Sequence, residues 1–350
     1  MKSKKASRPR KNGAVTLKAV AQHLGLTAGT VSVVLNNSKS AHSIPEHTRK
    51  RIFEAARELN YQPNFLARSL RVNRTFTVGV ITEEFGDAYG GAVLAGIETH
   101  LRAHDYFVLA VAHRHDTKLQ RTYAQLLMSR GAEGLITIDT SVNEIPPVPT
   151  VAVAGHKKME NVTNIILDHR RAAELALRHL KSLGHDCIAF LRGQPESSDS
   201  ATRWAALQQV AREFCIQIRP ELVIQMEGTD YTPELGYVYG KALMARGVPF
   251  TAMVAYNDIS AIGAMRAFQE KGLRTPEDVS IVGFDDISIA SFSIPALTTV
   301  RQPLEEMGRI AAQTLLDRID ETGLYVEEIA VEPTLIARRS TGPPQKSERH

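Results

Sequence analysis

The chain has 350 residues, of which 43% are hydrophobic and 23% charged, and it carries a formal net charge of +4. This length and apolar content allow large buried cores and favour two or three domains. No segment approaches the roughly 18 uninterrupted apolar residues of a membrane span, and the basic N-terminus lacks the apolar run of a signal peptide. We therefore expect a soluble, cytoplasmic protein that does not contact membranes.

Positive charge is concentrated in the first part of the chain. Residues 1–75 contain 15 Lys and Arg against 3 Asp and Glu, whereas residues 76–350 contain 27 against 35. Clustered basic charge neutralises phosphates, and an acidic remainder repels DNA, so this split favours DNA binding by the N-terminal segment alone. Residues 1–14 have no apolar pattern and are expected to form a disordered basic arm, with a merely solubilising tail as the alternative.

The segment TLKAVAQHLGLTAGTVSVVLN, residues 16–36, contains two short amphipathic helices separated by a glycine. In the first helix apolar residues recur at i, i+3, i+4 and i+7, and Thr16 is placed to cap the exposed NH groups. Gly25 permits a tight turn, and Thr27 can cap the second helix. This pattern predicts a helix-turn-helix, whose second helix enters the major groove of DNA.

The second helix should bury three apolar side chains, those of Val31, Val34 and Leu35. The remaining positions are then available to a groove: Ala28, Gly29, Thr30, Ser32, Val33 and Asn36. A third amphipathic helix with basic decoration is expected over residues 45–59. Three helices suffice for a small DNA-binding domain, which we assign to residues 15–62.

Residues 63–75 form a basic segment that begins at a helix-ending proline. Asn64 can cap a short helix containing Leu66 and Leu70, but a helix of this length is marginal in water. It could fold when two copies meet on DNA and insert a leucine between base steps. A plain charged linker is the alternative, and spacing alone favours it.

From residue 76 onward, short apolar runs alternate with helical stretches such as 91–103 and 117–130. The runs are expected strands, at residues 77–82, 106–112, 134–138, 150–154, 187–191, 222–226, 252–256 and 279–284. Continuous apolar strands separated by helices indicate parallel sheets covered on both faces, and eight or more strands indicate two subdomains. Ligands of such folds bind at the carboxyl ends of the strands. This rule selects polar residues within 83–91, 192–203, 257–258 and 285–286.

No catalytic or metal-binding set can be recognised. No phosphate-binding fingerprint is formed by the glycines Gly86, Gly90, Gly91 and Gly96. His113, His115 and Asp116 form the one metal-like cluster, and a solvated loop is the favoured interpretation. Cys187, in an expected strand, and Cys215, at an expected helix end, should be ordinary thiols. We expect no catalytic residue, no metal and no cofactor.

Four motifs then make the chain resemble the LacI/GalR family of bacterial repressors. In order along residues 15–339 they are TLKAVAQHLGLTAGTVSVVLN, NYQPNFLARSLR, GLRTPEDVSIVGFDDI and PALTTVRQPLEEMGRIAAQTLL. The resemblance implies an α/β protein with an all-α helix-turn-helix headpiece and a hinge helix, followed by a two-lobed periplasmic-binding-protein-like core with parallel sheets. It also implies a homodimer on a pseudo-palindromic operator in double-stranded DNA, whose operator affinity is set by a small-molecule effector bound between the lobes.

The resemblance divides the core, residues 76–340, into two lobes. The N-lobe is expected at about residues 76–175 plus 304–330, and the C-lobe at about 176–303 plus 331–340. Residues 341–350 should form a disordered tail, because Pro343 and Pro344 prevent a continuing helix. No heptad repeat is present to join dimers into tetramers, so we expect a dimer.

The matched reader helix starts at Thr27, and Thr30, Ser32 and Asn36 match positions that touch DNA in the family. Val33 departs from the family, because many members carry an arginine here that can pair with guanine, whereas valine offers only apolar contact. Leu70 matches the hinge leucine that enters the minor groove, which reverses the preference for a plain linker. The expected DNA-binding residues are Thr16, Thr27, Ala28, Gly29, Thr30, Ser32, Val33, Asn36, Leu70 and Arg71.

The resemblance also assigns effector-binding roles in the core. Arg203 matches an arginine that clamps effectors, with a solvated charge at a helix start as the alternative, and its planar fork suits hydroxyls, carboxylates or phosphates. Asp285 and Asn257 match ligand positions, whereas Asp258 should cap the following helix. Tyr231 occupies the place of an aromatic wall.

One loop departs from the family pattern Asn-Pro-Phe-Phe. This chain has instead Asp87, Ala88, Tyr89 and Gly90, which removes an aromatic ring and adds a carboxylate. The expected effector-binding residues are Asp87, Tyr89, Arg203, Tyr231, Asn257 and Asp285. Such a set suits a polyhydroxylated ligand such as a sugar, with a nucleobase less favoured.

Two other classes of protein were considered. A transport receptor would share the core, but it would need a signal peptide and would lack a basic headpiece. The main alternative is a DNA-binding regulator whose core responds to a protein partner or to no effector, which the altered loop at residues 87–90 keeps open. The response to the effector, release or recruitment of DNA, depends on small differences between two states that the sequence does not fix.

Overall fold

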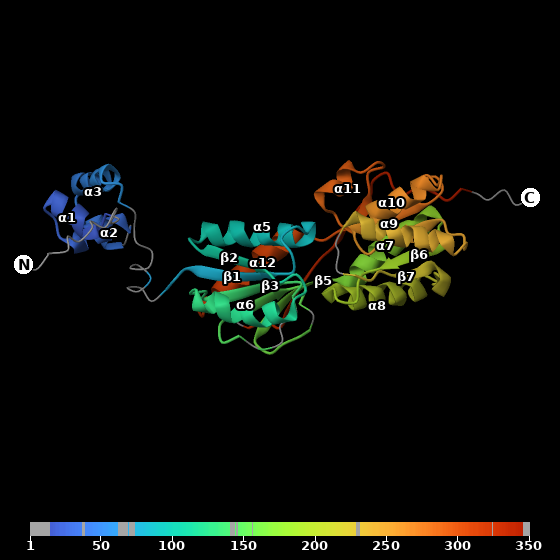
Figure 1. Ribbon diagram of the computed structural model, residues 1–350, viewed down its shortest axis with the longest axis horizontal. Helices are drawn as coiled ribbons and strands as arrows, with labels where there is room; N and C mark the ends of the chain where they lie inside the picture. Colours follow the sequence, from blue (N-terminus) through green and yellow to red (C-terminus); the bar gives the residue numbers. More distant parts are fainter. Residues whose placement is uncertain are drawn as a thin grey trace, which may run out of the picture. The chain divides into compact units, whose positions relative to one another are not determined.

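The structure is a computed structural model, and the chain divides into two compact units, Met1–Thr75 and Phe76–His350. It describes residues 15–36, 39–61, 69, 74–140, 144, 146–155, 157–228, 232–323 and 325–345. Leu70, Arg71 and Tyr231, together with the basic arm at 1–14, lie outside the described residues. Each unit is a separate fold (Figure 1) and is described by itself.

The N-terminal unit is a small helical domain. Its elements are α1 (Leu17–Leu24), α2 (Ala28–Leu35), the 3-10 helix η1 (Lys39–Ser43) and α3 (Glu46–Glu58). The Thr16 hydroxyl accepts the backbone NH of Ala19 at 3.3 Å, and Gly25 ends α1 in the left-handed region at φ +65°. Both features were predicted from the sequence. One core holds the helices together: Val20, Ala21, Val31, Val34, Ile52 and Ala55.

The N-lobe of the core contains a parallel six-stranded sheet in the order β11-β5-β4-β3-β1-β2. Its strands are β1 (Thr77–Thr82), β2 (Phe107–Ala112), β3 (Gly134–Ile138), β4 (Thr150–Val153), β5 (Val162–Leu167) and β11 (Glu328–Val331). Its helices are α5 (Ala88–Ala103), α6 (Thr117–Ser129) and α12 (Leu304–Ile319). Val80 packs toward α5 and α12, whereas the next residue, Ile81, packs with Leu127 of α6. The alternation covers both faces of the sheet.

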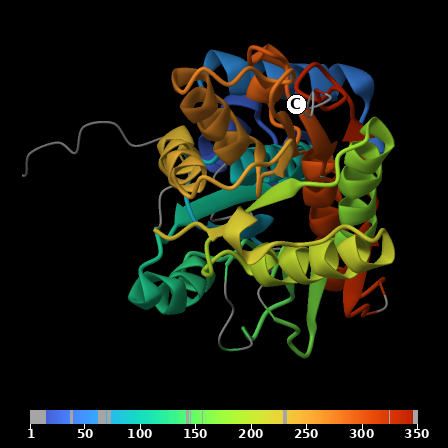
Figure 2. The ribbon, with the colours of Figure 1, turned by 90° about the vertical axis from the view of Figure 1, so that its right-hand side faces the viewer.

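The C-lobe contains a second sheet in the order β12-β10-β9-β8-β6-β7, in which only β12 runs antiparallel to its neighbour. Its strands are β6 (Ile188–Arg192), β7 (Val223–Gln225), β8 (Ala252–Val254), β9 (Ser280–Asp285), β10 (Thr298–Arg301) and β12 (Thr334–Ile336). Its helices are α7 (His169–Leu183), α8 (Ser198–Glu213), η2 (Pro220–Leu222), α9 (Pro233–Ala245), α10 (Asp258–Glu270) and α11 (Ser288–Phe292). Helices α7 and α8 pack on one face, and α9 and α10 on the other (Figures 1 and 2).

The chain passes between the two sheets three times, after β5, after β10 and after β11. The first passage occurs between Asp168 and His169, because α7 packs on α8, β10 and β12 of the C-lobe along its length. The sequence had placed this boundary at about residue 175, inside α7. The three connections meet at the carboxyl ends of β5, β10 and β11, which is where the site lies.

Glycines bring one pair of helices into backbone contact in each lobe. A Cβ atom on Gly96 of α5 would lie 1.9 Å from the Glu305 carbonyl oxygen of α12. In the C-lobe, a Cβ atom on Gly263 of α10 would lie 1.9 Å from the Pro233 carbonyl oxygen of α9. These crossings require glycine, because a side chain would overlap backbone atoms that cannot rotate away.

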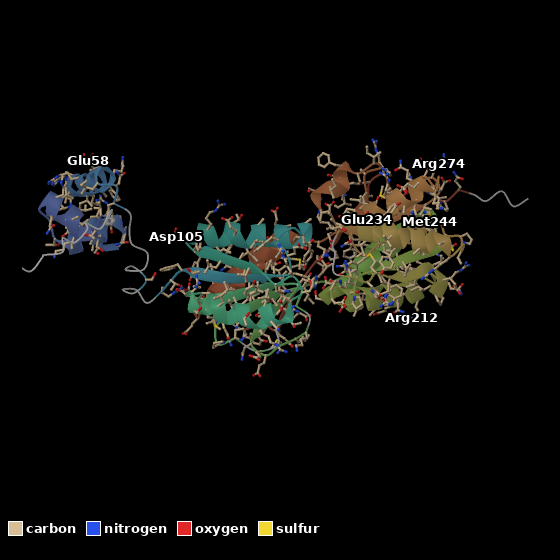
Figure 3. All side chains as sticks on the ribbon, in the orientation of Figure 1. Glu58, Asp105, Arg212, Glu234, Met244 and Arg274 are labelled. Carbon is tan, nitrogen blue, oxygen red and sulfur yellow. The ribbon has the colours of Figure 1, made fainter. Side chains whose placement is uncertain are left out.

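Many charged side chains lie on the outside of both units. Figure 3 labels several exposed examples: Glu58, Asp105, Arg212, Glu234 and Arg274. Among the helices that the structure describes, none combines the length and the apolar character that a bilayer crossing would require.

Candidate functional site

The reader helix α2 begins with a polar cap. The Thr27 hydroxyl accepts the NH of Thr30 at 3.1 Å and lies 2.9 Å from the Thr30 hydroxyl. Ala28 and Gly29 are exposed, whereas Thr30 and Val33 are half-buried. The first turn of α2 therefore presents small side chains and backbone, which suits a close approach to a groove.

The burial of Ser32 contradicts one expectation about α2. We expected its side chain to be available, but the residue is only 7% exposed. The Asn36 amide folds back over it, donating to the Ser32 carbonyl at 2.7 Å and lying 3.1 Å from the Ser32 hydroxyl. Such local side-chain bonding closes a helix end, and it covers Ser32 as a consequence. The expected DNA contacts of Leu70 and Arg71 lie outside the described residues.

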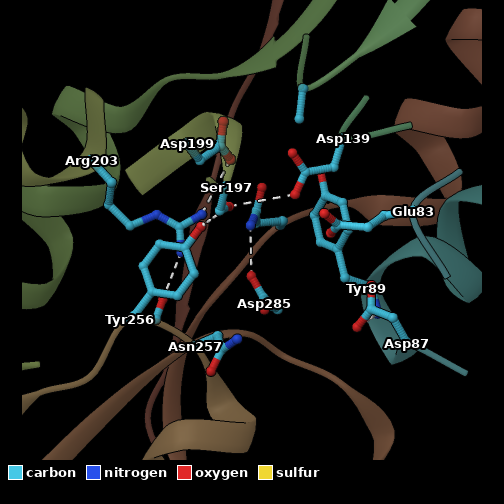
Figure 4. A pocket seen from close by; sticks show the side chains of 12 residues that line it. Glu83, Asp87, Tyr89, Asp139, Ser197, Asp199, Arg203, Tyr256, Asn257 and Asp285 are labelled. Atoms are coloured by element: carbon cyan, nitrogen blue, oxygen red, sulfur yellow. Dashed lines mark hydrogen bonds and ion pairs between the residues drawn. The ribbon is translucent and has the colours of Figure 1, made fainter. Parts of the chain in front are cut away.

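In the core, a polar pocket is formed by loops and helix starts of both lobes (Figure 4). It is lined by Glu83, Asp87, Tyr89, Asp139, Ala154, Ser197, Asp199, Arg203, Tyr256, Asn257, Asp285 and Gln302. The space between the lining atoms is about 400 Å³, part of it open to solvent. Five of the six residues expected to bind an effector line it, and the sixth, Tyr231, lies outside the described residues.

Asp87 and Tyr89 contribute from the start of α5. The Asp87 carboxylate caps the helix by accepting the NH groups of Tyr89 at 3.2 Å and Gly90 at 2.7 Å. Burial raises the pKa of Asp87, although these two hydrogen bonds oppose the shift. The Tyr89 hydroxyl is buried and has no hydrogen-bond partner among the described residues. Both carboxylate oxygens of Asp87 are thus used to cap α5, whereas the Tyr89 hydroxyl can still donate and accept a hydrogen bond.

Arg203 is held by a buried ionic network. Its guanidinium donates to the Tyr256 carbonyl at 2.6 Å and to the Asp199 carboxylate at 3.2 Å, and His169 lies 3.2 Å from the other Asp199 oxygen. Burial acts to raise the pKa of Asp199, but His169 and Arg203 outweigh it and lower the value to about 2. Arg203 is only 4% exposed, so the alternative of a solvated charge is wrong. Helix α8 begins at Ser198, six residues before the expected start at Trp204, which places Arg203 within the helix and inside the fold.

Aromatic rings enclose the same guanidinium. The Arg203 Cζ atom lies 4.6 Å from the Tyr256 ring centroid and 3.9 Å from the Phe284 ring centroid. Stacking of this kind fixes the plane of the guanidinium and occupies the ring faces. One face of each ring is therefore covered by Arg203.

Asp285 ends β9 with a left-handed backbone at φ +104° and is 7% exposed. One carboxylate oxygen accepts the Gln302 amide at 2.6 Å. Burial raises the pKa of Asp285 well above its usual range, with Arg203 opposing the shift. The neighbouring Asp286 turns away and bonds to Arg301 and Arg338. The turn after β9 therefore places the Asp285 carboxylate in the pocket. The Asp286 carboxylate instead holds Arg301 and Arg338, close to the connection between the lobes.

Asn257, and not Asp258, caps α10. The Asn257 side-chain oxygen Oδ1 accepts the Ser260 NH at 2.9 Å, and the Ser260 hydroxyl accepts the Asn257 NH at 3.2 Å in return. The expectation that Asp258 caps this helix is wrong. Asp258 is fully buried, where it accepts the Thr299 hydroxyl at 2.6 Å and the Ile287 NH at 2.9 Å. It ties the turn after β9 to β10.

The carboxyl group of Asp258 should make stability depend on pH. Burial raises its pKa to about 7, against the hydrogen bonds from Thr299 and Ile287. The folded state then binds a proton that the unfolded state releases near pH 4, so this contribution to stability falls as pH rises from about 4 to 7. We expect the difference in unfolding free energy between wild type and Asp258→Asn to move by about 2 kcal/mol in favour of the variant between pH 5 and 8. Urea unfolding at both pH values measures it, and a pH-independent difference contradicts the assignment.

One carboxylate joins the two lobes across the pocket. Asp139, which follows β3 of the N-lobe, accepts the Ser198 NH at 3.1 Å and the Ser197 hydroxyl at 3.4 Å. The Ser197 hydroxyl also lies 2.5 Å from the Tyr256 hydroxyl. The start of α8 is thus held by a group of the opposite lobe.

Several lining residues were missed by the sequence analysis. Glu83, Ser197 and Asp199 fell inside the selected stretches without being singled out, and Tyr256 ended an expected strand. Asp139 follows an expected strand, so the rule of strand carboxyl ends could have found it. Gln302 lies in a connection between the lobes, where no local sequence pattern points to a ligand.

The histidine cluster beside the pocket is only in part a solvated loop, because Asp116 is exposed whereas His113 is buried. His113 is 1% exposed, and its ring lies 3.0 Å from the Thr140 hydroxyl. His115 lies 2.7 Å from the Glu83 carboxylate, and Asp116 caps α6. Among the described residues, no group of His, Cys, Asp and Glu side chains is arranged to hold a metal ion.

Comparison with known families gives two matches. Residues 16–64 match the family described as bacterial regulatory proteins, lacI family. Residues 177–341 match the periplasmic binding protein-like domain. The two matches fall on the helix-turn-helix unit and on the C-lobe with its connections.

Full-length relatives agree with these matches. The chain is 33% identical to the HTH-type transcriptional repressor PurR of Erwinia tasmaniensis, over 93% of this chain and 96% of that protein. Among solved structures it is similar to the Lac repressor dimer bound to operator and the anti-inducer ONPF, with a TM-score of 0.84, 27% identity, and coverage of 94% and 100%. A complex of the transcriptional regulator CelR with cellobiose gives a TM-score of 0.68, 25% identity, and coverage of 93% and 99%.

Proposed function

Because the chain belongs to the LacI family of bacterial regulatory proteins, we propose that a small polar effector bound between its lobes sets its affinity for DNA. The protein is a DNA-binding transcriptional repressor and not an enzyme, as its relatives are repressors. The observation that carries the effector proposal is the pocket between the lobes, which five of the expected effector residues line. CelR, bound to cellobiose, is a structural neighbour whose ligand is a sugar.

The chemistry of the pocket supports a hydroxylated ligand over a flat ring. Carboxylates and amides of the lining accept and donate hydrogen bonds as hydroxyl groups require. Arg203 stacks on Tyr256, and Phe284 is buried and does not line the pocket, so neither ring is an open platform for a nucleobase. A sugar or sugar derivative is therefore the favoured effector, and a nucleobase is the second candidate.

Thermal unfolding against a panel of pentoses, hexoses, sugar acids, disaccharides and nucleosides tests this proposal. A ligand present at 100 times its dissociation constant adds about 2.7 kcal/mol of stability, enough to raise the unfolding midpoint by several degrees. The stabilising compound should also change the affinity for operator DNA in a fluorescence anisotropy titration. A panel without effect favours the alternative, a core that answers to a protein partner or to no effector.

We further propose a homodimer on a pseudo-palindromic operator, as in the Lac repressor dimer. Exposed apolar side chains support it: Phe107 on the edge strand β2 is 62% exposed, and Phe292 and Ile294 after β9 are 80% and 95% exposed. Such residues are typical of a surface that a second copy covers. Light scattering should give the mass of a dimer, and a tetramer would overturn this expectation.

Replacement of Val33 should change the operator that the protein prefers. Arginine at this position can donate two hydrogen bonds to guanine, an interaction worth about 1–3 kcal/mol, whereas valine contributes apolar contact only. We expect Val33→Arg to select G·C at one position of each half-site, and Val33→Ala to leave the preference unchanged. Selection from a randomised DNA library measures both motifs. Identical motifs for Val33→Arg and wild type would refute the assignment of this residue to base readout.

A further inference from the structure

The lining of the pocket indicates the charge of its ligand. We propose that the effector is a cationic polyol, a small molecule with several hydroxyl groups and at least one protonated amine, and without phosphate or carboxylate groups. This inference rests on the proposed effector site and narrows its ligand class.

The pocket contains many more acidic than basic side chains. Five carboxylates line it, against a single arginine. The charge of that arginine is already balanced by Asp199, because one terminal nitrogen donates to the Tyr256 carbonyl and the other to the Asp199 carboxylate, and only its buried Nε–H has no partner among the described residues. Among the described lining residues, no cation is left to neutralise an anionic ligand. A phosphate or a carboxylate would enter a site whose charges repel it.

Buried and unpaired acceptors form a second and independent observation. Gln302 is 2% exposed, and its carbonyl oxygen has no hydrogen-bond partner among the described residues while its amide donates to Asp285. The Tyr89 hydroxyl is equally buried and unpaired. Buried polar atoms of this kind cost free energy until a ligand supplies a partner. The unpaired carbonyl oxygen of Gln302 can only accept, so its partner must donate, as hydroxyl and ammonium groups do.

The state of Asp285 explains why an ammonium group fits better than a further hydroxyl. Burial raises the pKa of Asp285 well above its usual range, and Arg203 offsets only part of this effect. Burial therefore favours the neutral carboxylic acid, and a positive charge beside Asp285 would restore the carboxylate. An ammonium group donating to Asp285 provides that charge, and the resulting charge-assisted hydrogen bond is about twice as strong as a neutral one.

Matched compounds test the proposal on the full-length protein. The probes are D-glucosamine with D-glucose, D-galactosamine with D-galactose, the anions D-glucose 6-phosphate and D-gluconate, and spermidine as an amine without hydroxyl groups. Dissociation constants come from calorimetry and from thermal unfolding. We expect at least one amino sugar to bind 10-fold or more tightly than its neutral partner, and no binding of the anions or of spermidine.

Two variants test whether the preference for amines over neutral sugars arises in the pocket. Asp285→Asn should reduce the ratio of amine to neutral affinity to near one. Asp87→Asn should reduce it as well, and this variant keeps a good cap for α5, so it serves if Asp285→Asn does not fold. The control Asp186→Asn removes an exposed carboxylate outside the pocket and should leave the ratio unchanged.

The outcomes separate the two levels of proposal. Binding of a neutral sugar or an anion in preference to every amine overturns the cationic ligand and leaves the effector site in place. An amine preference that survives in both pocket variants also overturns it. Failure of every compound, in these sets and in the wider panel above, counts against the effector site as well.

Discussion

Replacing Gly96 with alanine should lower the unfolding free energy of the core by about 3 kcal/mol or more. The new Cβ atom would lie 1.9 Å from the Glu305 carbonyl oxygen and 2.9 Å from its Cα atom. Because these are backbone atoms of α12, relief requires the two helices to separate. The same crossing is equally close from the other side, where a Cβ atom on Gly308 would lie 2.1 Å from the Val93 carbonyl oxygen. Urea unfolding followed by circular dichroism measures the loss.

Gly91 provides a matched control on the same helix. A Cβ atom there would have no neighbour within 4 Å, and the residue is exposed. Gly91→Ala should therefore raise stability by up to about 1 kcal/mol through helix propensity alone. Equal effects of the two substitutions would show that the α5–α12 crossing tolerates a side chain.

The contrast between Gly91 and Gly96 shows that a local sequence pattern does not predict distant helix contacts. The sequence presents Gly91 and Gly96 alike, as members of a glycine-rich stretch without a phosphate fingerprint. Only the packing of α12, about 200 residues further along the chain, distinguishes them. Helix–helix contacts of this range leave no local pattern that a single sequence displays.

Strands were predicted where the sequence has a continuous apolar run and were missed where polar residues interrupt it, as in β5 (VTNIIL) and β10 (TTVR). The eight apolar runs correspond to β1–β4 and β6–β9, within about two residues at each end. The missed strand β5 is interrupted by Asn164, whose side chain bonds to the backbone of Gly155. Strands β11 and β12 are short, partly exposed and paired with distant segments. Their existence depends on neighbours and not on their own composition.

The pocket was also predicted only in part, because some of its residues depend on distant segments. Residues at the carboxyl ends of strands, such as Asn257 and Asp285, follow from the topology of parallel sheets. The partners that hold them do not, because Gln302 and His169 come from the connections between lobes. Arg203 was expected to meet solvent or ligand with a free guanidinium, and the structure surrounds it with Asp199 and two aromatic rings instead.

The substitution Arg203→Met should destabilise the core by about 3–5 kcal/mol, because it leaves the buried Asp199 carboxylate with His169 as its one charged partner among the described residues. Asp199 is 13% exposed, so water can replace the guanidinium only in part. Fluorescence of Trp204, the single tryptophan of the chain and the neighbour of Arg203 on α8, reports the unfolding.

The double variant Arg203→Met with Asp199→Asn distinguishes a structural from a ligand-binding role. Removing both charges should recover part of the lost stability, since a neutral amide is less costly to bury than an unpaired carboxylate. The response of operator affinity to the effector should stay absent in both variants, while operator binding itself persists, because the helix-turn-helix unit is a separate fold. A double variant that regains the effector response would make Arg203 a purely structural residue. One that regains no stability would show that Asp199 is already satisfied by His169 alone.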